Sequence, residues 1–414
     1  MSFFRKFAEI LVDSPFIKEK FDEIIEFLLS SKTFVIVERL LQRVKGSSKN
    51  RAPKKQKGGG QKMKKEEYFI RQMGENLDAL MNIDPTCIGI NRLCYPGVRD
   101  YAGGPTAMHF AQELSKVLKP EDVVLILCGF VLRNHQRTEM DGFTGALLTA
   151  RALVEGFDVK PVIVIPQESQ QALKNCAAVV GLNYYDSLDL VLERPFAMTG
   201  VVIPKDAKAA EECADKILAF NPRALISMET ASPNEKGVYH MAYGWDVTKI
   251  EAKMDVLFNK VKERAIPTFS IGDCGNELGM GAIKNYIQEH VPGAGEGGCI
   301  CECKGGAAAA TAADHIIIAK TADWGCYAMI AALAYLKKNM KIMHDANLQA
   351  DLMKAAAYHG MLTTNGSLTP AIDGFSVKFN ATLIDLMRQC VEIGVTSEDA
   401  MWIDKFTKTG FFTE

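Results

Sequence analysis

The stretch "DVVLILC", residues 122–128, indicates the fold class, because every residue after Asp122 is apolar. A strand in which apolar and polar residues do not alternate is buried on both faces, which is typical of a parallel sheet. Helical patterns such as "GFTGALLTARALVEGF" separate this run from later ones. The sequence therefore predicts an α/β fold with a doubly wound, mainly parallel sheet of the Rossmann-like kind. The other predicted strands cover residues 160–166, 200–204, 223–229, 267–273 and 314–320.

The chain is predicted to have three parts. Residues 1–44 form an added N-terminal helical segment, in which Ser14 can cap a helix and Pro15 suits its first position. Residues 45–65 hold nine Lys or Arg and no acid, so they are predicted to be a basic, disordered linker. Such a run can also contact nucleic acid or anionic lipid, but without interleaved aromatic residues a solvated linker is favoured. Residues 66–414 form the α/β domain.

Composition excludes several classes of protein. Of the 414 residues 48% are apolar and 24% charged, which is typical of a globular protein with a sizeable core. The net charge of −2 argues against a general polyanion binder, so no specific nucleic acid is expected. No apolar run reaches the roughly 18 residues of a membrane span. The eleven scattered cysteines favour reduced thiols in a reducing compartment, expected to be the cytoplasm, with mitochondria as the alternative.

Polar residues cluster directly after the predicted strands, where ligands bind in open parallel sheets. Each of these residues could instead have a purely structural role, since acids favour helix starts and a tryptophan at such a position often packs in the core. Their repetition at successive strand ends favours one assembled pocket. The residues expected to bind substrate in these loops are Arg133, Glu139, Asp141, Gly142, Glu229, His240, Thr321 and Trp324.

The loop "IGDCGNELGMG", residues 271–281, places Asp273, Asn276 and Glu277 among closely spaced glycines. Glycines either make a packed turn or let the backbone approach a ligand. The second interpretation makes the three polar residues catalytic candidates and adds glycines to the substrate-binding set. These glycines are Gly272, Gly275 and Gly279.

Three familiar signatures are absent from the sequence: the dinucleotide-binding G-x-G-x-x-G, the P-loop and the serine-hydrolase elbow. The segment "CICEC", residues 299–303, lacks the C-x-x-C spacing of zinc knuckles. It could hold a soft metal together with another cysteine, but we interpret it as a short strand with reduced thiols. No metal site and no cofactor are therefore assigned from the sequence.

The loops together resemble one family, the C-terminal domain of D-glutamate cyclase. The motif at 271–281 is the most specific of the matching stretches, which follow the family's order across residues 85–395. The others are "GGPTA" (103–107), "TEMDGFTGA" (138–146), "METASPNEKGVYHMAYGWDVT" (228–248), "ADWGCYA" (322–328) and "AIDG" (371–374).

The resemblance implies a hydro-lyase that cyclises D-glutamate to 5-oxo-D-proline with loss of water. Ring closure needs a base for the ammonium group, an acid for the departing oxygen and donors for the oxyanion. Asp273 and Glu277 are the candidate base and acid, and Asn276 with the glycine amides could line the oxyanion pocket. Arg133, Arg137 or Arg99 could bind a substrate carboxylate.

Two other classes of function remain open. The acids could hold Mg²⁺ or Mn²⁺ in a metal-dependent hydrolase or phosphotransferase acting on a small acidic metabolite. Alternatively, the protein is a non-catalytic small-molecule sensor, in which Cys274 marks a site that has lost its activity. The expected partner is in each case a small molecule, an acidic amino acid for the cyclase, and the oligomeric state stays open.

Overall fold

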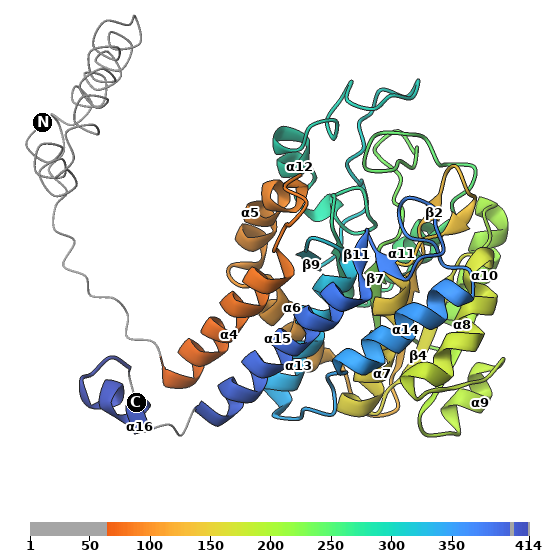
Figure 1. Cartoon of the computed structure of the whole chain (residues 1–414). Coiled ribbons are helices and arrows are strands. Elements are labelled where there is room, and N and C mark those ends of the chain that lie inside the picture. Colours follow the sequence, from red (N-terminus) through yellow and green to blue (C-terminus); the bar gives the residue numbers. More distant parts are fainter. Residues whose placement is uncertain (1–63, 398–400, 413–414) are drawn as a thin grey trace, which may run out of the picture. The chain divides into compact units, whose positions relative to one another are not determined.

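The computed structural model describes residues 64–397 and 401–412, so the predicted helical segment and nearly all of the predicted linker lie outside the described residues. Residues 63–414 form one compact unit. Its centre is a seven-stranded sheet, parallel throughout, in the order β5-β6-β4-β1-β7-β8-β9 (Figure 1). The strands are β1 (Val123–Cys128), β4 (Lys160–Ile165), β5 (Asn183–Tyr184), β6 (Ala197–Val202), β7 (Ala224–Met228), β8 (Thr268–Gly272) and β9 (His315–Ile318).

Both faces of the sheet are covered, as the unalternating strands predicted. In β1, Val124 and Ile126 contribute to one hydrophobic core, while Leu125 and Leu127 contribute to the other. All four side chains are fully buried. Burial of such a side chain contributes about 1.5–3 kcal/mol, so the two cores hold the sheet between two helical layers. The prediction of a doubly wound α/β fold is confirmed.

The helices divide between the two faces of the sheet. One core contains residues of α4 (Lys65–Met81), α6 (Thr106–Val117), α7 (Phe143–Phe157), α8 (Gln170–Cys176), α13 (Ala322–Lys337), α14 (Ala346–Tyr358) and α15 (Val377–Ser397). The other contains residues of α5 (Ile90–Ala102), α9 (Leu188–Leu192), α10 (Ala207–Leu218), α11 (Met254–Glu263) and α12 (Lys284–His290). The other helical elements are α16 (Met401–Lys408) and the short 3₁₀ helices at Gln167–Ser169, Ala177–Val180 and Gly281–Ile283. Two small antiparallel hairpins lie outside the main sheet. One pairs β2 (Val131–Leu132) with β3 (Arg137–Thr138), and the other pairs β10 (Ala371–Ile372) with β11 (Phe375–Ser376).

The direction in which successive strands are added to the sheet changes between β1 and β7. The chain runs from β1 to β4, then to the edge strand β5 and back to β6 between them, and then crosses to β7 on the other side of β1. Open α/β sheets bind ligands beyond the carboxyl ends of the strands at such a point. The loops that follow β1, β7, β8 and β9 meet there.

Three details differ from the sequence-based expectations. Strand β6 covers Ala197–Val202, earlier than the predicted 200–204, and includes Gly200, where a Cβ atom would lie 2.5 Å from the side chain of Leu173. Helix α4 begins at Lys65, the last residue of the predicted linker. The prediction of a strand at 299–303 is wrong: the segment is an irregular loop rich in turns. Within the described residues, no helix combines the length and apolarity that crossing a membrane requires.

A buried acid outside the sheet gives the first testable prediction. Glu251 is 1% exposed, accepts the backbone N–H of Val131 at 2.8 Å, and has its pKa raised by burial to about 8. Below about pH 4.5 the carboxyl group is protonated in both the folded and unfolded states. As the pH rises towards 8 only the unfolded chain ionises, so the free energy of unfolding falls.

The variant Glu251→Gln keeps the acceptor for Val131 but does not titrate. Its Tm should therefore exceed that of the unmodified protein by a margin that grows between about pH 4.5 and pH 8. Calorimetry at stepped pH measures this margin. A difference in Tm that stays constant across this range would show that the buried carboxyl group is not the cause.

Candidate active site

A cavity of about 170 Å³ opens at the carboxyl ends of β7, β8 and β9. It lies below the range of about 300–1,000 Å³ typical of sites for drug-sized ligands, so it suits a small metabolite. Its apolar lining comprises Ile88, Ile90, Phe130, Leu132, Met241, Ala242 and Tyr243. Its polar lining comprises Thr86, Asn91, Glu139, Glu229, Asp273, Cys274, Asn276, Lys320, Thr364 and Asp373.

Asp273 is the first residue after β8 and lines the cavity. One of its carboxylate oxygens lies within 4.8 Å of carboxylate oxygens of Asp141 and Asp373. Burial and the neighbouring Glu277 carboxylate raise the pKa of Asp273 well above its ordinary value. A carboxyl group in this setting can exchange a proton near neutral pH, as a general base must.

Glu277 lies behind Asp273 and holds the loop in place. Its two carboxylate oxygens accept the backbone N–H groups of Cys274 and Gly275, each at 2.8 Å. The side chain is 1% exposed and does not line the cavity. A Cβ atom on Gly272 would lie 2.5 Å from Glu277 Oε2, so Gly272 provides the space that this carboxylate occupies.

Glu229 is the first residue after β7 and has a left-handed backbone conformation, with φ of +40°. Residues other than glycine adopt this conformation at a cost and concentrate at functional sites. Its Oε2 is buried without a hydrogen-bond partner, and burial together with Asp273 raises its pKa well above the ordinary value. A Cβ atom on Gly142 would lie 2.4 Å from Glu229 Cβ, so Gly142 also provides room for an acid.

Asp141 anchors the buried helix α13 to the site. Its carboxylate accepts the first backbone N–H groups of that helix, from Ala322 at 2.9 Å and Asp323 at 2.8 Å, where the helix dipole favours negative charge. Burial, with Asp373, nevertheless raises the pKa of Asp141. Burial also raises the pKa of Asp323 to about 7, although Thr144 donates a hydrogen bond to it. Both carboxyl groups therefore bind a proton more readily than they would in water.

Glu139 and Asp373 complete the group of acids. Glu139 lines the cavity from the loop after β3, and burial and Asp373 raise its pKa. Asp373 comes from the turn between β10 and β11, where Thr364 donates a hydrogen bond to it. Its φ is +49°, a second left-handed residue that is not glycine. Asp373 was not among the residues predicted for the site, although it lies in the stretch "AIDG".

Lys320 is the one basic side chain among the described residues that line the cavity. Its Nζ lies 3.5 Å from Asp84 Oδ1, and the side chain is 14% exposed. It was also missed by the sequence-based site prediction. Its position after β9, at the start of a matching loop, is the signal that could have identified it.

The predicted arginines lie elsewhere. Arg133 is exposed and covers the ring of Trp245 at 5.2 Å. Arg137 is exposed as well, and Arg99 pairs with Glu75 at 2.6 Å. None of the three arginines lines the cavity.

Asn276 connects the cavity to a neighbouring loop. Its Nδ2 donates to the backbone oxygen of His240 at 3.1 Å, while its buried Oδ1 has no partner. The imidazole of His240 does not line the cavity and lies instead beside Cys301, with Nε2 to Sγ at 3.1 Å. The free amide oxygen of Asn276 is therefore the group left for a ligand.

The other predicted residues have structural roles. Thr321 caps α13 by accepting the backbone N–H of Trp324 at 3.2 Å. Trp324 is fully buried and donates from Nε1 to Asn380 at 2.9 Å. Gly279 has φ of +98°, and a Cβ atom there would lie 2.5 Å from that of Ser270.

A group of three carboxylates at the cavity could hold a divalent cation. Asp141, Asp273 and Asp373 each offer a carboxylate oxygen, all within 4.8 Å of one another. Oxygen ligands of this kind suit Mg²⁺ or Mn²⁺.

Comparison with known proteins identifies matches across most of the described chain. A family described as "D-glutamate cyclase-like, C-terminal" matches residues 77–388. The human protein named "D-glutamate cyclase, mitochondrial" is 26% identical over 223 residues. That match covers 51% of this chain and 33% of the human protein, so the chain spans about a third of its relative's length.

Proposed function

We propose that this chain, which belongs to the D-glutamate cyclase-like family, cyclises D-glutamate to 5-oxo-D-proline with loss of water. The observation that carries the proposal is the pairing of Asp273 and Glu229 in one small cavity. Burial and the Asp273 carboxylate raise the pKa of Glu229, and burial and the Glu277 carboxylate raise that of Asp273. Two coupled acids of this kind can hold one proton between them, so one serves as base while the other serves as acid.

Asp273 is the proposed general base. The α-ammonium group of the substrate must lose a proton before its nitrogen can form a bond to the γ-carboxyl carbon. Asp273 lines the cavity and leads directly out of β8, so its position is set by the sheet. Proton transfer to a positioned base contributes typically about 10²–10⁴ in rate.

Glu229 is the proposed general acid. Over the whole reaction the C–N bond forms, one C–O bond breaks, and two protons move from the nitrogen to the departing oxygen. The raised pKa of Glu229 keeps its carboxyl group protonated, and its Oε2 has no partner within the protein. Protons pass between the coupled carboxyl groups, which restores the starting state.

The remaining lining residues orient the substrate. Asn276 Oδ1 accepts from the ammonium group, and Lys320 attracts the α-carboxylate. Protonated carboxyl groups, such as Glu139 in the same cavity, donate to a carboxylate instead of repelling it. Because the substrate carries its own nucleophile, orientation within the cavity supplies much of the acceleration. In this scheme Glu277 is not the acid that the sequence suggested. It positions the loop by accepting two backbone hydrogen bonds.

A second candidate function rests on the triad of Asp141, Asp273 and Asp373. With a bound Mg²⁺ or Mn²⁺ the site would act on a small acidic metabolite as a hydrolase or phosphotransferase. The metal would supply a Lewis acid, and these three carboxylates would hold it. The two candidates differ in whether Asp273 exchanges a proton or acts as a ligand.

Incubation of the full chain with D-glutamate, and separately with L-glutamate, tests the proposal. We expect D-glutamate to lose one water, detected by mass spectrometry and chiral chromatography as 5-oxo-D-proline. The matched control is Glu251→Gln, which removes a buried carboxyl group that does not line the cavity and should retain activity. Parallel samples contain EDTA, followed by Mg²⁺, Mn²⁺ or Zn²⁺.

The outcomes separate the candidates. Turnover that persists in EDTA supports the metal-free acid–base scheme. Loss of turnover that Mg²⁺ or Mn²⁺ restores, but Zn²⁺ does not, supports a metal at the carboxylate triad. Saturable binding of D-glutamate without any product, in the presence or absence of added metal, would contradict the cyclase and favour the sensor.

The proposed reaction takes place in a reducing compartment, the cytoplasm. All eleven cysteines are free in the structure, which fits such a compartment. The human relative is by its name mitochondrial, which is the alternative. The partner needed is a small acidic amino acid.

A further inference from the structure

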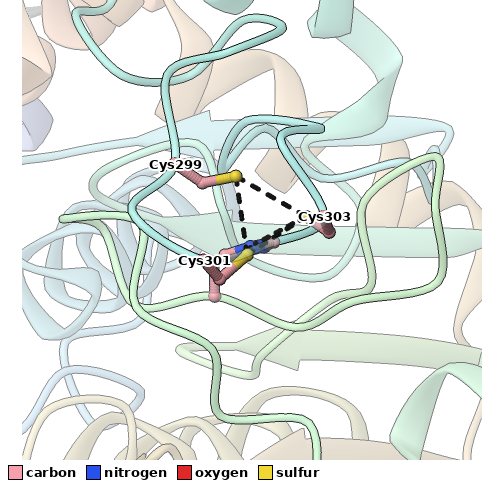
Figure 2. A group of neighbouring side chains, drawn as sticks. Cys299, Cys301 and Cys303 are labelled. Atoms are coloured by element: carbon pink, nitrogen blue, oxygen red, sulfur yellow. Dashed lines mark hydrogen bonds between the residues drawn. The ribbon is translucent and has the colours of Figure 1, made fainter.

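Three cysteines and one histidine meet in the irregular loops beside the cavity. Figure 2 shows the thiols of Cys299, Cys301 and Cys303 turned toward one another. Their Sγ atoms are 3.6 Å apart for 299–301, 3.2 Å for 301–303 and 3.5 Å for 299–303. His240 Nε2 lies 3.1 Å from Cys301 Sγ and 3.5 Å from Cys303 Sγ.

These distances fit four ligands around one ion. Tetrahedral zinc has Zn–S bonds near 2.3 Å and Zn–N bonds near 2.0–2.1 Å, which places neighbouring ligand atoms about 3.5–3.8 Å apart. The observed separations are equal to this or a few tenths of an ångström shorter. A disulfide bond would need about 2.05 Å, and three thiols cannot pair completely. The C-x-C-x-C spacing thus converges on a centre whose fourth ligand is His240, whereas the sequence analysis considered a soft metal only together with another cysteine.

The surroundings support thiolate ligands. The backbone N–H of Gly305 points at Cys303 Sγ at 3.3 Å, and Asn234 Nδ2 lies 3.6 Å from the same sulfur. Donors of this kind orient and stabilise metal-bound sulfur. Cys299 and His240 are buried, whereas Cys301 and Cys303 are half-buried, so the centre is shielded on one side from bulk solvent.

We propose that His240, Cys299, Cys301 and Cys303 bind one structural Zn²⁺. Three thiolates and an imidazole form a Cys₃His set, which selects zinc over the hard cations that suit the carboxylates of the cavity. All four ligands come from the protein, so no position is left open for a substrate. This metal is therefore distinct from a catalytic one.

The proposed ion connects a loop that lines the cavity to a second loop that lies beside it. His240 belongs to the loop after β7, and its backbone oxygen receives the amide of Asn276. The next residues, Met241, Ala242 and Tyr243, line the cavity. The cysteines belong to the separate segment 299–303, which is joined to the first loop by Ile300 N–H donating to Gly244 O at 3.2 Å. The ion would reinforce the direct contacts between these loops, such as those from Asn234 Nδ2 to Gly306 O and from Lys236 Nζ to Cys303 O, each at 2.8 Å.

Metal analysis of the purified full chain tests the site independently of activity. We expect elemental mass spectrometry to find about one zinc per chain. Chemical modification of the thiols should release this zinc. Cys301→Ser and Cys303→Ser should reduce zinc to background, whereas Cys390→Ser on α15 should leave it unchanged. Replacement by Co²⁺ should give the charge-transfer and visible bands of tetrahedral cobalt thiolate. Chelation should lower Tm, since the metal binds the folded state.

Several results would overturn the site. One is a folded, metal-free protein that takes up neither Zn²⁺ nor Co²⁺. Another is zinc retained in the double variant Cys301→Ser/Cys303→Ser. Fewer than eleven titratable thiols after denaturation without reductant would indicate a disulfide instead. If the serine variants do not fold, the stoichiometry and cobalt spectrum of the unmodified chain still decide.

Discussion

Asp273→Asn should lower the rate of lactam formation by about 10²–10⁴, the usual contribution of a general base. Asparagine keeps the shape of the side chain and removes the proton acceptor. Because burial and Glu277 raise the pKa of Asp273, the negative charge is costly in the folded state. The Tm of the variant should therefore equal or exceed that of the unmodified protein.

Initial rates with D-glutamate and Tm are measured on the same preparation. Glu251→Gln is the control, since it also neutralises a buried carboxyl group but should retain the full rate. Zinc content serves as a second control, because Asp273 is not among its proposed ligands. Full activity of Asp273→Asn would remove Asp273 from the mechanism, and a lower Tm would assign it a structural role.

The sequence predicted the fold well because the decisive information is local. Unalternating apolar runs such as 122–128 need cover on both faces, and this requirement alone indicates a parallel sheet between helices. The position of the cavity followed from the same argument, since acids placed directly after strands must meet at one edge of the sheet. Asp273 and Glu229 lie in the cavity for that reason.

The sequence did not predict which side chains surround the glycines or which distant residues complete the cavity, because both depend on contacts between residues far apart in the chain. Gly272 and Gly142 suggested contact with a ligand, yet the space beside them is filled by Glu277 and Glu229. Only the packed structure shows which atom occupies such a space. Asp373 reaches the cavity from the hairpin of β10 and β11, one hundred residues after Asp273, and no strand of the main sheet directly precedes it.

The same limit explains the cysteines. Alternating residues at 299–303 fit a strand, in which Cys299, Cys301 and Cys303 would share one face. Surrounding glycines instead permit tight turns, and Gly306 adopts a φ of +79°. Turns bring the three thiols around His240, the fourth proposed ligand, which lies 61 residues before Cys301 and which no spacing rule connects to them.

Glu229→Gln should combine a large loss of activity with a gain in stability. Glutamine keeps the length of the side chain but cannot give a proton to the departing oxygen, so the rate should fall by about 10²–10⁴. Burial raises the pKa of Glu229, so the stability present below its ordinary pKa is lost as the pH rises through the folded value. Glutamine does not titrate, and the margin in Tm over the unmodified protein should widen as the pH rises.

The pH profile of the rate distinguishes this role from a merely structural one. In the unmodified protein the rate should fall at alkaline pH as the acid loses its proton, and in Glu229→Gln this alkaline decline should disappear from the remaining activity. Since the carboxyl groups are coupled, the midpoint belongs to the pair of Glu229 and Asp273. An alkaline decline unchanged in the variant would assign the acid to another group, of which Glu277 is the first to test by Glu277→Gln. A Tm margin that does not depend on pH would show that Glu229 is not held protonated, and the acid role would then fail even if activity were lost.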